Sequence, residues 1–280
     1  MKPPPLIGRE EIEAALDFEA AADALEAALR DGLDPEAEPP RTALPAGPGE
    51  LLVMPAVAGS HATVKLVTVG GSPRIQGVAV VFDSASLAPV ALLDAVALTA
   101  LRTASVSLLA ARYLARRPLG RLVVFGRGPQ GLAHAAALGA GLAAAEGVTL
   151  GSEATADAVA AAVRGADLVV CATTARQPLF DGGLLGEGAT AIAIGSHEPD
   201  ARELDAGLVR RAAVVVESRR TALAEAGDLT MAGLGGEAMT TLAELVGGAE
   251  LPAAGPRLFK STGMSWEDAV LADAVLARRG

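Results

Sequence analysis

The stretch RLVVFGRGPQGLAHAAAL, residues 121–138, sets an apolar run of strand length against a turn with three glycines and then an alanine-rich segment. In a nucleotide-binding βαβ unit the first glycine permits a tight turn and the second lets a pyrophosphate approach the backbone. The third lets the helix pack closely on the strand. Gly126, Gly128 and Gly131 fill these three places. The stretch therefore predicts a dinucleotide-binding loop, with an ordinary glycine-rich turn as the alternative.

The sequence around this loop alternates apolar runs of strand length with helical stretches. Continuous apolar runs are typical of parallel strands that are covered on both faces. We therefore predict an α/β fold, a Rossmann-type doubly wound parallel sheet, over residues 118–256. Its predicted strands are RLVVF, DLVVCAT, ATAIAIG and AAVVVES, and its predicted helices lie around 129–145, 153–164 and 203–211.

The remaining sequence has a different pattern and predicts an α+β domain formed by residues 1–117 with 257–280. One amphipathic helix is expected over 9–32, followed by an irregular Pro- and Gly-rich loop over 34–50. Four Val- and Leu-rich segments predict a mainly antiparallel sheet, and a long helix is expected to end near Pro118. The four segments are LLVMPAV, HATVKLVTVG, IQGVAVVFD and LAPVALLD, and a last helix closes the chain.

Composition excludes several classes of protein. Hydrophobic residues make up 51% of the chain and charged residues 20%, which argues against disorder over most of its length. The net charge of −10 makes nucleic acid and anionic membranes poor partners. Cys171 is the only cysteine, so no multi-cysteine metal site is expected, and no other metal site is predicted. The N-terminus lacks the apolar core of a signal peptide, and we expect a cytoplasmic protein.

Four polar residues have positions that suggest a role. Lys65 lies inside an apolar strand, where a charge needs a partner or a cleft. Arg102 interrupts an apolar helix, and Arg41 follows two prolines that present it rigidly. His197 follows an apolar strand at the edge where doubly wound sheets bind ligands. For each of the four, a solvent-facing side chain without function is the alternative.

In order along the chain, PPRT, LLVMP, VKLVTV, LTALRTAS, VVFGRGPQG, ADLVVCATT, AIGSHEPDARELD and LFKSTGMSWED resemble the motifs of the ornithine cyclodeaminase and mu-crystallin family. Members of that family combine a substrate and dimerisation domain with a Rossmann domain that binds NAD or NADP. They act on small amino or imino acids.

The resemblance implies roles for particular residues. Arg41, Lys65 and Arg102 match the positions that hold the substrate carboxylate, and His197 is a candidate to pass a proton alongside Lys65. The residues implied in cofactor binding are Gly126, Arg127, Gly128, Gln130, Gly131, Thr173, Gly195 and Ser261. The resemblance further implies a homodimer, and the acidic charge predicts no nucleic acid or membrane partner.

Two departures argue against ornithine as the substrate. Leu52 stands where the cyclodeaminases carry a glutamate for the distal amine, and leucine cannot pair with ammonium. His197 stands where they carry an aspartate, and Ala201 replaces their lysine. We therefore expect an NAD(P)-dependent oxidoreductase of an imino or amino acid, a cyclic ketimine reductase or an alanine-dehydrogenase-like enzyme. Ornithine cyclodeamination is the less favoured alternative.

A third departure concerns the cofactor domain, which is short around residues 140–165. A Rossmann unit needs a second strand that ends in an acidic residue for the ribose. Only VTL, residues 148–150, is strand-like here, and it resembles the family's third strand, so one strand and one helix are expected to be missing. Alternatively, VTL is the second strand and Glu153 contacts the ribose. A shortened domain also permits a non-catalytic binding or structural protein.

Overall fold

The computed structural model describes residues 3–115 and 118–279. The chain divides into two compact units, one formed by Met1–Val106 with Met264–Gly280 and the other by Ser107–Gly263. The C-terminal helix groups with the N-terminal part of the chain. Residues 107–115 and 257–263, which the sequence pattern assigns to the first domain, group with the second unit.

The first unit contains a six-stranded sheet in the order β1-β6-β5-β4-β3-β2. Its strands from β2 to β6 are antiparallel neighbours, as the alternating Val- and Leu-rich segments predict, and β1 pairs in parallel with β6. The elements are β1 (Leu6–Ile7), α1 (Arg9–Ala15), α2 (Phe18–Arg30), the 3-10 helix η1 (Pro35–Ala37), β2 (Thr42–Ala46), β3 (Gly49–Ala58), β4 (His61–Val69), β5 (Ile75–Asp83), β6 (Pro89–Asp94) and α10 (Ser265–Ala277).

Two predictions for this unit are wrong. The single N-terminal helix is two helices, because Asp17 caps α2 by accepting a hydrogen bond from the Ala20 N–H at 2.7 Å. The loop around Arg41 contains strand β2, which pairs with β3 on one side only and is exposed at every residue. An edge strand tolerates Pro45, which is why a proline-rich segment can be a strand here.

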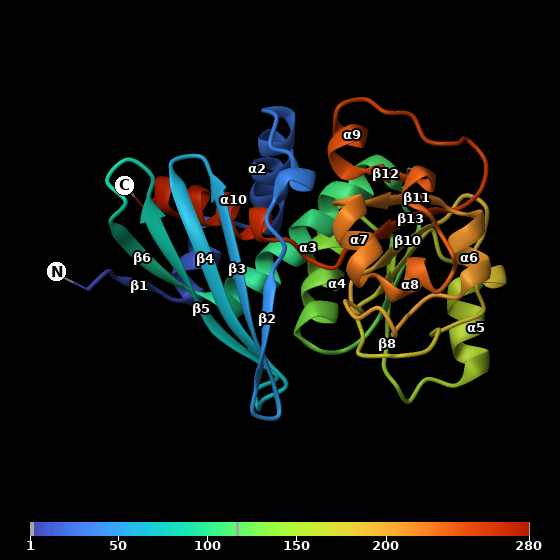
Figure 1. The fold of residues 1–280 in the computed structure, drawn as a ribbon. Helices are drawn as coiled ribbons and strands as arrows, with labels where there is room; N and C mark the ends of the chain where they lie inside the picture. Colours follow the sequence, from blue (N-terminus) through green and yellow to red (C-terminus); the bar gives the residue numbers. More distant parts are fainter. Residues whose placement is uncertain (1–2, 116–117, 280) are drawn as a thin grey trace. The chain divides into compact units, whose positions relative to one another are not determined.

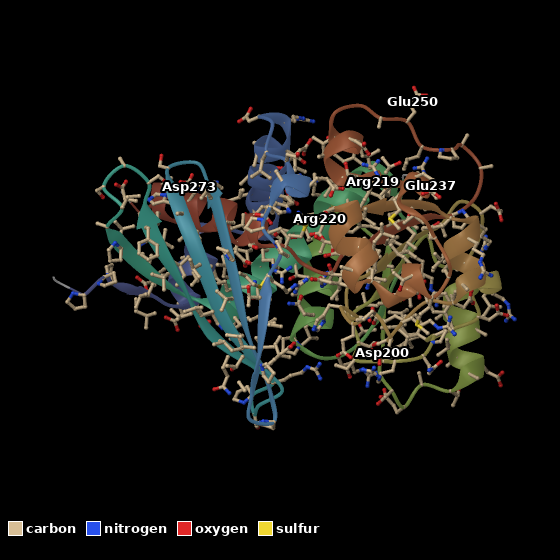
Figure 2. The ribbon with its side chains drawn as sticks, viewed as in Figure 1. Asp200, Arg219, Arg220, Glu237, Glu250 and Asp273 are labelled. Atoms are coloured by element: carbon tan, nitrogen blue, oxygen red, sulfur yellow. The ribbon has the colours of Figure 1, made fainter. Side chains whose placement is uncertain are left out.

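Helix α10 packs on β3 and β4, so the last helix of the chain covers strands formed near its beginning. Figure 1 shows α10 in red beside the blue and cyan strands of this unit. Asp273 of α10, labelled in Figure 2, accepts the Ser60 N–H at 2.9 Å and lies 2.7 Å from His61 Nδ1, which ties the β3–β4 turn to the helix. Residues on β4 alternate between buried and partly exposed, and Thr63, Lys65 and Val67 are the buried set.

The long helix α3 (Ala95–Leu114) belongs to both units, with the division after Val106. Among the described residues, α3 is the one helix long and apolar enough to cross a membrane. Of its apolar window, 83% is buried inside the structure, which is how a core helix packs. The second part is fixed to the second unit by the Leu114 carbonyl, which accepts from Arg257 at 2.7 Å and from Thr190 at 3.2 Å. The helix ends before Pro118, as predicted.

The second unit is a parallel, seven-stranded sheet in the order β12-β11-β13-β10-β9-β7-β8, which confirms the predicted Rossmann-type α/β fold. The strands are β7 (Arg121–Phe125), β8 (Glu146–Leu150), β9 (Leu168–Cys171), β10 (Thr190–Ala193), β11 (Ala213–Val216), β12 (Met239–Thr241) and β13 (Arg257–Lys260). The helices are α4 (Pro129–Gly141), α5 (Ala156–Arg164), η2 (Gly182–Leu184), α6 (Ala206–Arg211), α7 (Arg219–Glu225), α8 (Gly227–Thr230), η3 (Gly236–Ala238) and α9 (Leu242–Val246).

Strand β13 shows why residues 257–260 group with the second unit. Residues Arg257–Lys260 pair with β10 on one side and β11 on the other, so they lie in the middle of the second sheet. The sequence places them directly before the terminal helix, and a four-residue apolar run does not itself indicate which sheet it joins.

Strand β8 corrects the interpretation of VTL. It pairs in parallel with β7, with Val148 opposite Val123, and it forms the edge of the sheet as far as the structure describes the chain. It therefore occupies the second-strand position of a Rossmann sheet, not the third. The alternative that VTL is the second strand is therefore correct, and among the described residues it is the third strand that is absent.

Candidate functional site

The glycine loop between β7 and α4 has the geometry that its sequence predicts. Gly126 adopts φ +113°, which side chains disfavour, and a Cβ there would lie 2.4 Å from the Ala172 carbonyl oxygen. A Cβ on Gly131 would lie 2.0 Å from the Gly126 carbonyl oxygen. The first glycine is therefore required by the turn, and the third by the close contact between helix and strand.

Gly128 differs from these two glycines. Its φ of −76° suits any residue, and a Cβ there would meet no atom of the described chain within 4 Å. Neither the fold nor the local backbone thus requires a glycine at this position. The open space lies at the N-terminus of α4, where backbone N–H groups and the helix dipole attract a phosphate. These features fit the pyrophosphate of a dinucleotide, which Gly128 and the first turn of α4, including Gln130, would hold.

Arg127, the residue between the first two glycines, forms an ion pair with Glu153. Their side chains are 2.5 Å apart and about 60% exposed, and Arg127 also donates to the Thr149 carbonyl at 3.4 Å. Glu153 follows β8 closely, at the carboxyl end of the second strand. This is the place of the acidic residue that binds the ribose hydroxyls in NAD-binding Rossmann units.

Thr173 and Gly195, two of the predicted cofactor residues, both donate hydrogen bonds to Glu203, a carboxylate that the sequence analysis did not identify. Glu203 is fully buried and accepts hydrogen bonds from Thr173 N at 2.8 Å, Thr173 Oγ1 at 2.7 Å and Gly195 N at 2.8 Å. Burial raises the pKa of Glu203, and the positive charge of Lys260 opposes that rise. Glu203 thereby ties together the loops that follow β9 and β10.

Lys260 and Asp228 continue this buried network. Lys260 Nζ lies 3.0 Å from Asp228 Oδ2 and donates to the Ser196 carbonyl at 2.6 Å. Asp228 accepts the backbone N–H groups of Glu203 and Leu204. The neighbouring Ser261 is 1% exposed, and its hydroxyl accepts from Gly263 N at 3.0 Å. The hydroxyl of Ser261 thus stabilises its own turn.

His197 lies in the loop after β10 and is partly exposed. The carbonyl of the preceding residue, Ser196, accepts a hydrogen bond from Lys260. On the surface, Arg176 pairs with Glu198 and also with Asp200 at 2.6 Å, and Asp200 is labelled in Figure 2. The loop of His197 is therefore fixed on both sides, at the carboxyl edge of the sheet where the sequence predicts it.

In the first unit, Lys65 forms a buried ion pair. Its Nζ lies 2.6 Å from Asp268 Oδ2 of α10, and both side chains are 1% exposed. The pKa of Lys65 is lowered to about 8, because burial and the nearby charge of Arg102 together outweigh the opposing effect of Asp268. The prediction that a charge on this strand needs a partner is confirmed.

Arg102 of α3 lies beside this pair. Its Nη1 donates to Glu267 Oε2 at 2.8 Å, and its Nε lies 3.9 Å from Asp268 Oδ1. Arg102 is 8% exposed and Glu267 is fully buried. Two of the three predicted carboxylate-binding cations are thus brought to the first turn of α10.

Glu38, three residues before Arg41 in the chain, contacts the same turn of α10. The backbone N–H groups of Ser265 and Trp266 donate to the Glu38 carboxyl group. Burial raises the pKa of Glu38 to about 8, and the negative charges of Glu267 and Asp268 contribute. Arg41 is partly exposed and follows the rigid Pro39–Pro40 segment.

The acidic partners of these cations were not predicted. The adjacent acidic residues of the segment SWEDAVLADAV lie in a predicted helix, where acidic side chains more often face solvent. The helix begins at Ser265, and Glu267 accepts the Met264 N–H at 3.2 Å. Because α10 is buried at each residue from Ser265 to Ala272, its two carboxylates need cationic partners.

Known proteins resemble this chain over its whole length. A reductase of Δ1-pyrroline-2-carboxylate and Δ1-piperideine-2-carboxylate from Azospirillum brasilense is 31% identical, and the match covers 100% of this chain and 98% of the relative. That match spans 309 aligned positions, 29 more than the 280 residues of this chain, so this chain is shorter than the alignment.

Solved structures agree with this relationship. A probable ornithine cyclodeaminase from Bordetella pertussis Tohama I has a TM-score of 0.90 and 33% identity, covering 99% of this chain and 97% of its own. The Thermococcus litoralis Δ1-pyrroline-2-carboxylate reductase, solved with NADH and L-proline, has a TM-score of 0.84 and 26% identity, with 98% and 96% covered.

The family model matches the chain in two segments, residues 6–150 and 142–279, which overlap over residues 142–150 around β8. The matched segments include the glycine loop, the Lys65 strand, Arg102 and the first turn of α10. On these grounds the chain belongs to the ornithine cyclodeaminase/mu-crystallin family.

Proposed function

We propose that this protein is an NAD(P)H-dependent reductase of a small cyclic imino acid of the pyrroline-2-carboxylate type. The observation that carries the proposal is the pair of buried cations, Lys65 and Arg102, at the first turn of α10. A carboxylate is the substrate group that such a pair would recognise. The named reductases among its relatives and the geometry of the glycine loop support the same reaction.

The reaction adds one hydride to the imine carbon and one proton to the imine nitrogen, so that the C=N bond becomes a C–N single bond. When bound, the reduced nicotinamide supplies the hydride. In the proposal, Lys65, Arg102 and Arg41 bind and orient the substrate carboxylate. His197 passes the proton to the nitrogen, which is a task that imidazole performs near neutral pH.

The residues around Lys65 favour a substrate with a hydrocarbon ring over one with a distal charge. Met54 lies opposite Lys65 in the sheet register, and Leu52, Met54, Val67 and Ala95 form a buried apolar cluster. The ammonium group of ornithine would lose its hydration beside such a surface without gaining a partner. Cyclodeamination of ornithine is therefore the less favoured reaction.

A substrate panel tests the proposal. Purified protein would be assayed for oxidation of NADH and of NADPH with pyrroline-2-carboxylate, piperideine-2-carboxylate, and pyruvate with ammonia, and for release of ammonia from ornithine. We expect reduction of the cyclic imines and no turnover of ornithine. Formation of proline from ornithine without imine reduction would overturn the proposal. Failure to bind either dinucleotide at millimolar concentrations would favour a non-catalytic protein.

We further propose that the protein is a cytoplasmic homodimer. The single cysteine is consistent with a reducing compartment, and an archaeal alanine dehydrogenase with the same fold is described as a dimer. Sedimentation of the purified protein tests the oligomeric state, and a monomer at micromolar concentrations would contradict it.

A further inference from the structure

The ion pair between Lys65 and Asp268 is costly to bury, and stability alone does not account for it. Removing two charges from water carries a large desolvation penalty, and well-packed apolar residues often stabilise such a site equally well. Lys65 lies on a sheet face whose neighbours, Met54 and Val67, are apolar. A methionine or leucine would suit this environment, so the charge is explained better by a function than by packing.

We propose that Asp268 is a positioning residue for imine reduction, whose carboxylate keeps Lys65 protonated and fixed in place before the substrate carboxylate binds. This inference rests on the proposed function. It makes the first turn of α10 responsible for the protonation and the position of Lys65. Lys65 would contact the substrate, and Asp268 would act through Lys65.

The charged groups around Lys65 show why it needs this partner. Asp268 and Glu267 face it from α10, and Arg102 faces it from α3. Burial and the charge of Arg102 both favour the neutral amine, whereas the two carboxylates favour the ammonium form. Glu267 accepts a hydrogen bond from Arg102 at 2.8 Å, whereas Asp268 lies 2.6 Å from Lys65. Asp268 is therefore the carboxylate in direct contact with Lys65. A neutral Lys65 could not form an ion pair with a substrate carboxylate.

Glu267 provides a matched comparison within the same helical turn. Glu267 and Asp268 are adjacent, both buried, and each pairs with one of the two cations. Arginine remains charged at every accessible pH, whereas lysine can lose its proton. Loss of Glu267 would therefore disturb the position of Arg102, and loss of Asp268 would change the protonation of Lys65.

The chain is well suited to a direct titration of Lys65, because it contains three lysines, Lys2, Lys65 and Lys260. In protein labelled with ¹⁵N at the lysine Nζ, the signal of Lys65 would be assigned by its loss in Lys65→Arg. We expect Asp268→Asn to lower the titration midpoint of Lys65 by about 1 to 3 pH units, and Glu267→Gln to shift it much less. Asp268→Glu, which keeps the charge, would retain a midpoint near that of the wild type.

The same variants give a second readout in the enzyme. We expect the fall of kcat/KM at high pH to move to lower pH in Asp268→Asn, while Glu267→Gln lowers kcat/KM without moving the fall comparably. A circular dichroism spectrum and a cooperative thermal transition like those of the wild type would verify that each variant is folded. An unchanged Lys65 midpoint in folded Asp268→Asn would overturn the inference. If no imine is reduced by wild-type protein, the proposed function fails, and the NMR titration still tests the effect of Asp268 on Lys65.

Discussion

The Lys65 ammonium nitrogen lies 2.6 Å from a carboxylate oxygen of Asp268, and each side chain is 1% exposed. The pair joins a strand near the beginning of the chain to the helix that ends it. Arg102 and Glu267 form a second pair beside it. The first turn of α10 is therefore part of the candidate substrate site and not merely a terminal support for the sheet.

Replacing Lys65 alone should affect both stability and turnover. In Lys65→Met, Asp268 remains buried without its partner, which should lower the free energy of unfolding by about 3–5 kcal/mol. The double variant Lys65→Met/Asp268→Leu should recover most of this loss without recovering turnover. Urea unfolding and steady-state assays measure the two effects. Equal stability of the single and double variants would contradict the ion-pair account.

Alanine substitutions at two loop glycines should distinguish an effect on folding from an effect on cofactor binding. Gly128→Ala should leave the melting temperature unchanged, because its φ is ordinary and the space is open, yet weaken NADH binding about tenfold, or ~1.4 kcal/mol. Gly126→Ala should destabilise the fold by roughly 1–3 kcal/mol, because its φ is +113° and the Ala172 carbonyl lies close. Calorimetric titration and thermal unfolding test both variants. Unaltered NADH affinity in Gly128→Ala would exclude a pyrophosphate at this loop.

The position of Glu153 predicts a preference for NADH over NADPH. A carboxylate at the end of the second strand binds the ribose hydroxyls and repels a 2′-phosphate. Glu153→Ser should reduce the preference by about tenfold, or ~1.4 kcal/mol, because Arg127 then becomes available to the phosphate. Glu146→Ser is the matched control, since Glu146 lies at the other end of β8 and pairs with Arg121 at 3.5 Å. Tighter binding of NADPH by the wild type would show that Glu153 does not select the cofactor.

Stability should fall as the pH rises from acid to mildly alkaline values, in part because of Glu38. Its pKa is raised from 4.5 to about 8 in the folded protein. As the pH rises, the unfolded chain therefore loses this proton at a lower pH than the folded protein does. The contribution to stability is complete below pH 4.5 and is lost as the pH rises through about 8. Glu38→Gln should flatten the dependence of the melting temperature on pH across this range. A wild-type curve and a variant curve of the same slope would contradict this linkage.

Much of the fold follows from local sequence patterns, whereas partnerships between distant residues do not. The strand, turn and helix of residues 121–138 are specified by glycines whose constraints are local, and they form as predicted. The break at Asp17 was missed because the apolar periodicity continues across it, and β2 was missed because Pro45 disfavours every strand except an edge.

The same distinction applies to the site. Lys65 can be predicted because a charged side chain in an apolar strand needs an ionic partner or a cleft. Asp268 cannot, because its partner is found only when α10 packs on β4. Glu203 escapes prediction for the same reason, since the Thr173 and Gly195 donors come from two separate loops.

Transfer of deuterium would show whether this chain reduces a cyclic imino acid with hydride from a dinucleotide. Pyrroline-2-carboxylate would be incubated with the protein and NADH that carries deuterium at both C4 positions, and the product would be examined by mass spectrometry and NMR. The account predicts proline with a single deuterium on its α-carbon. Proline without deuterium, or no proline while NADH is bound, would contradict it.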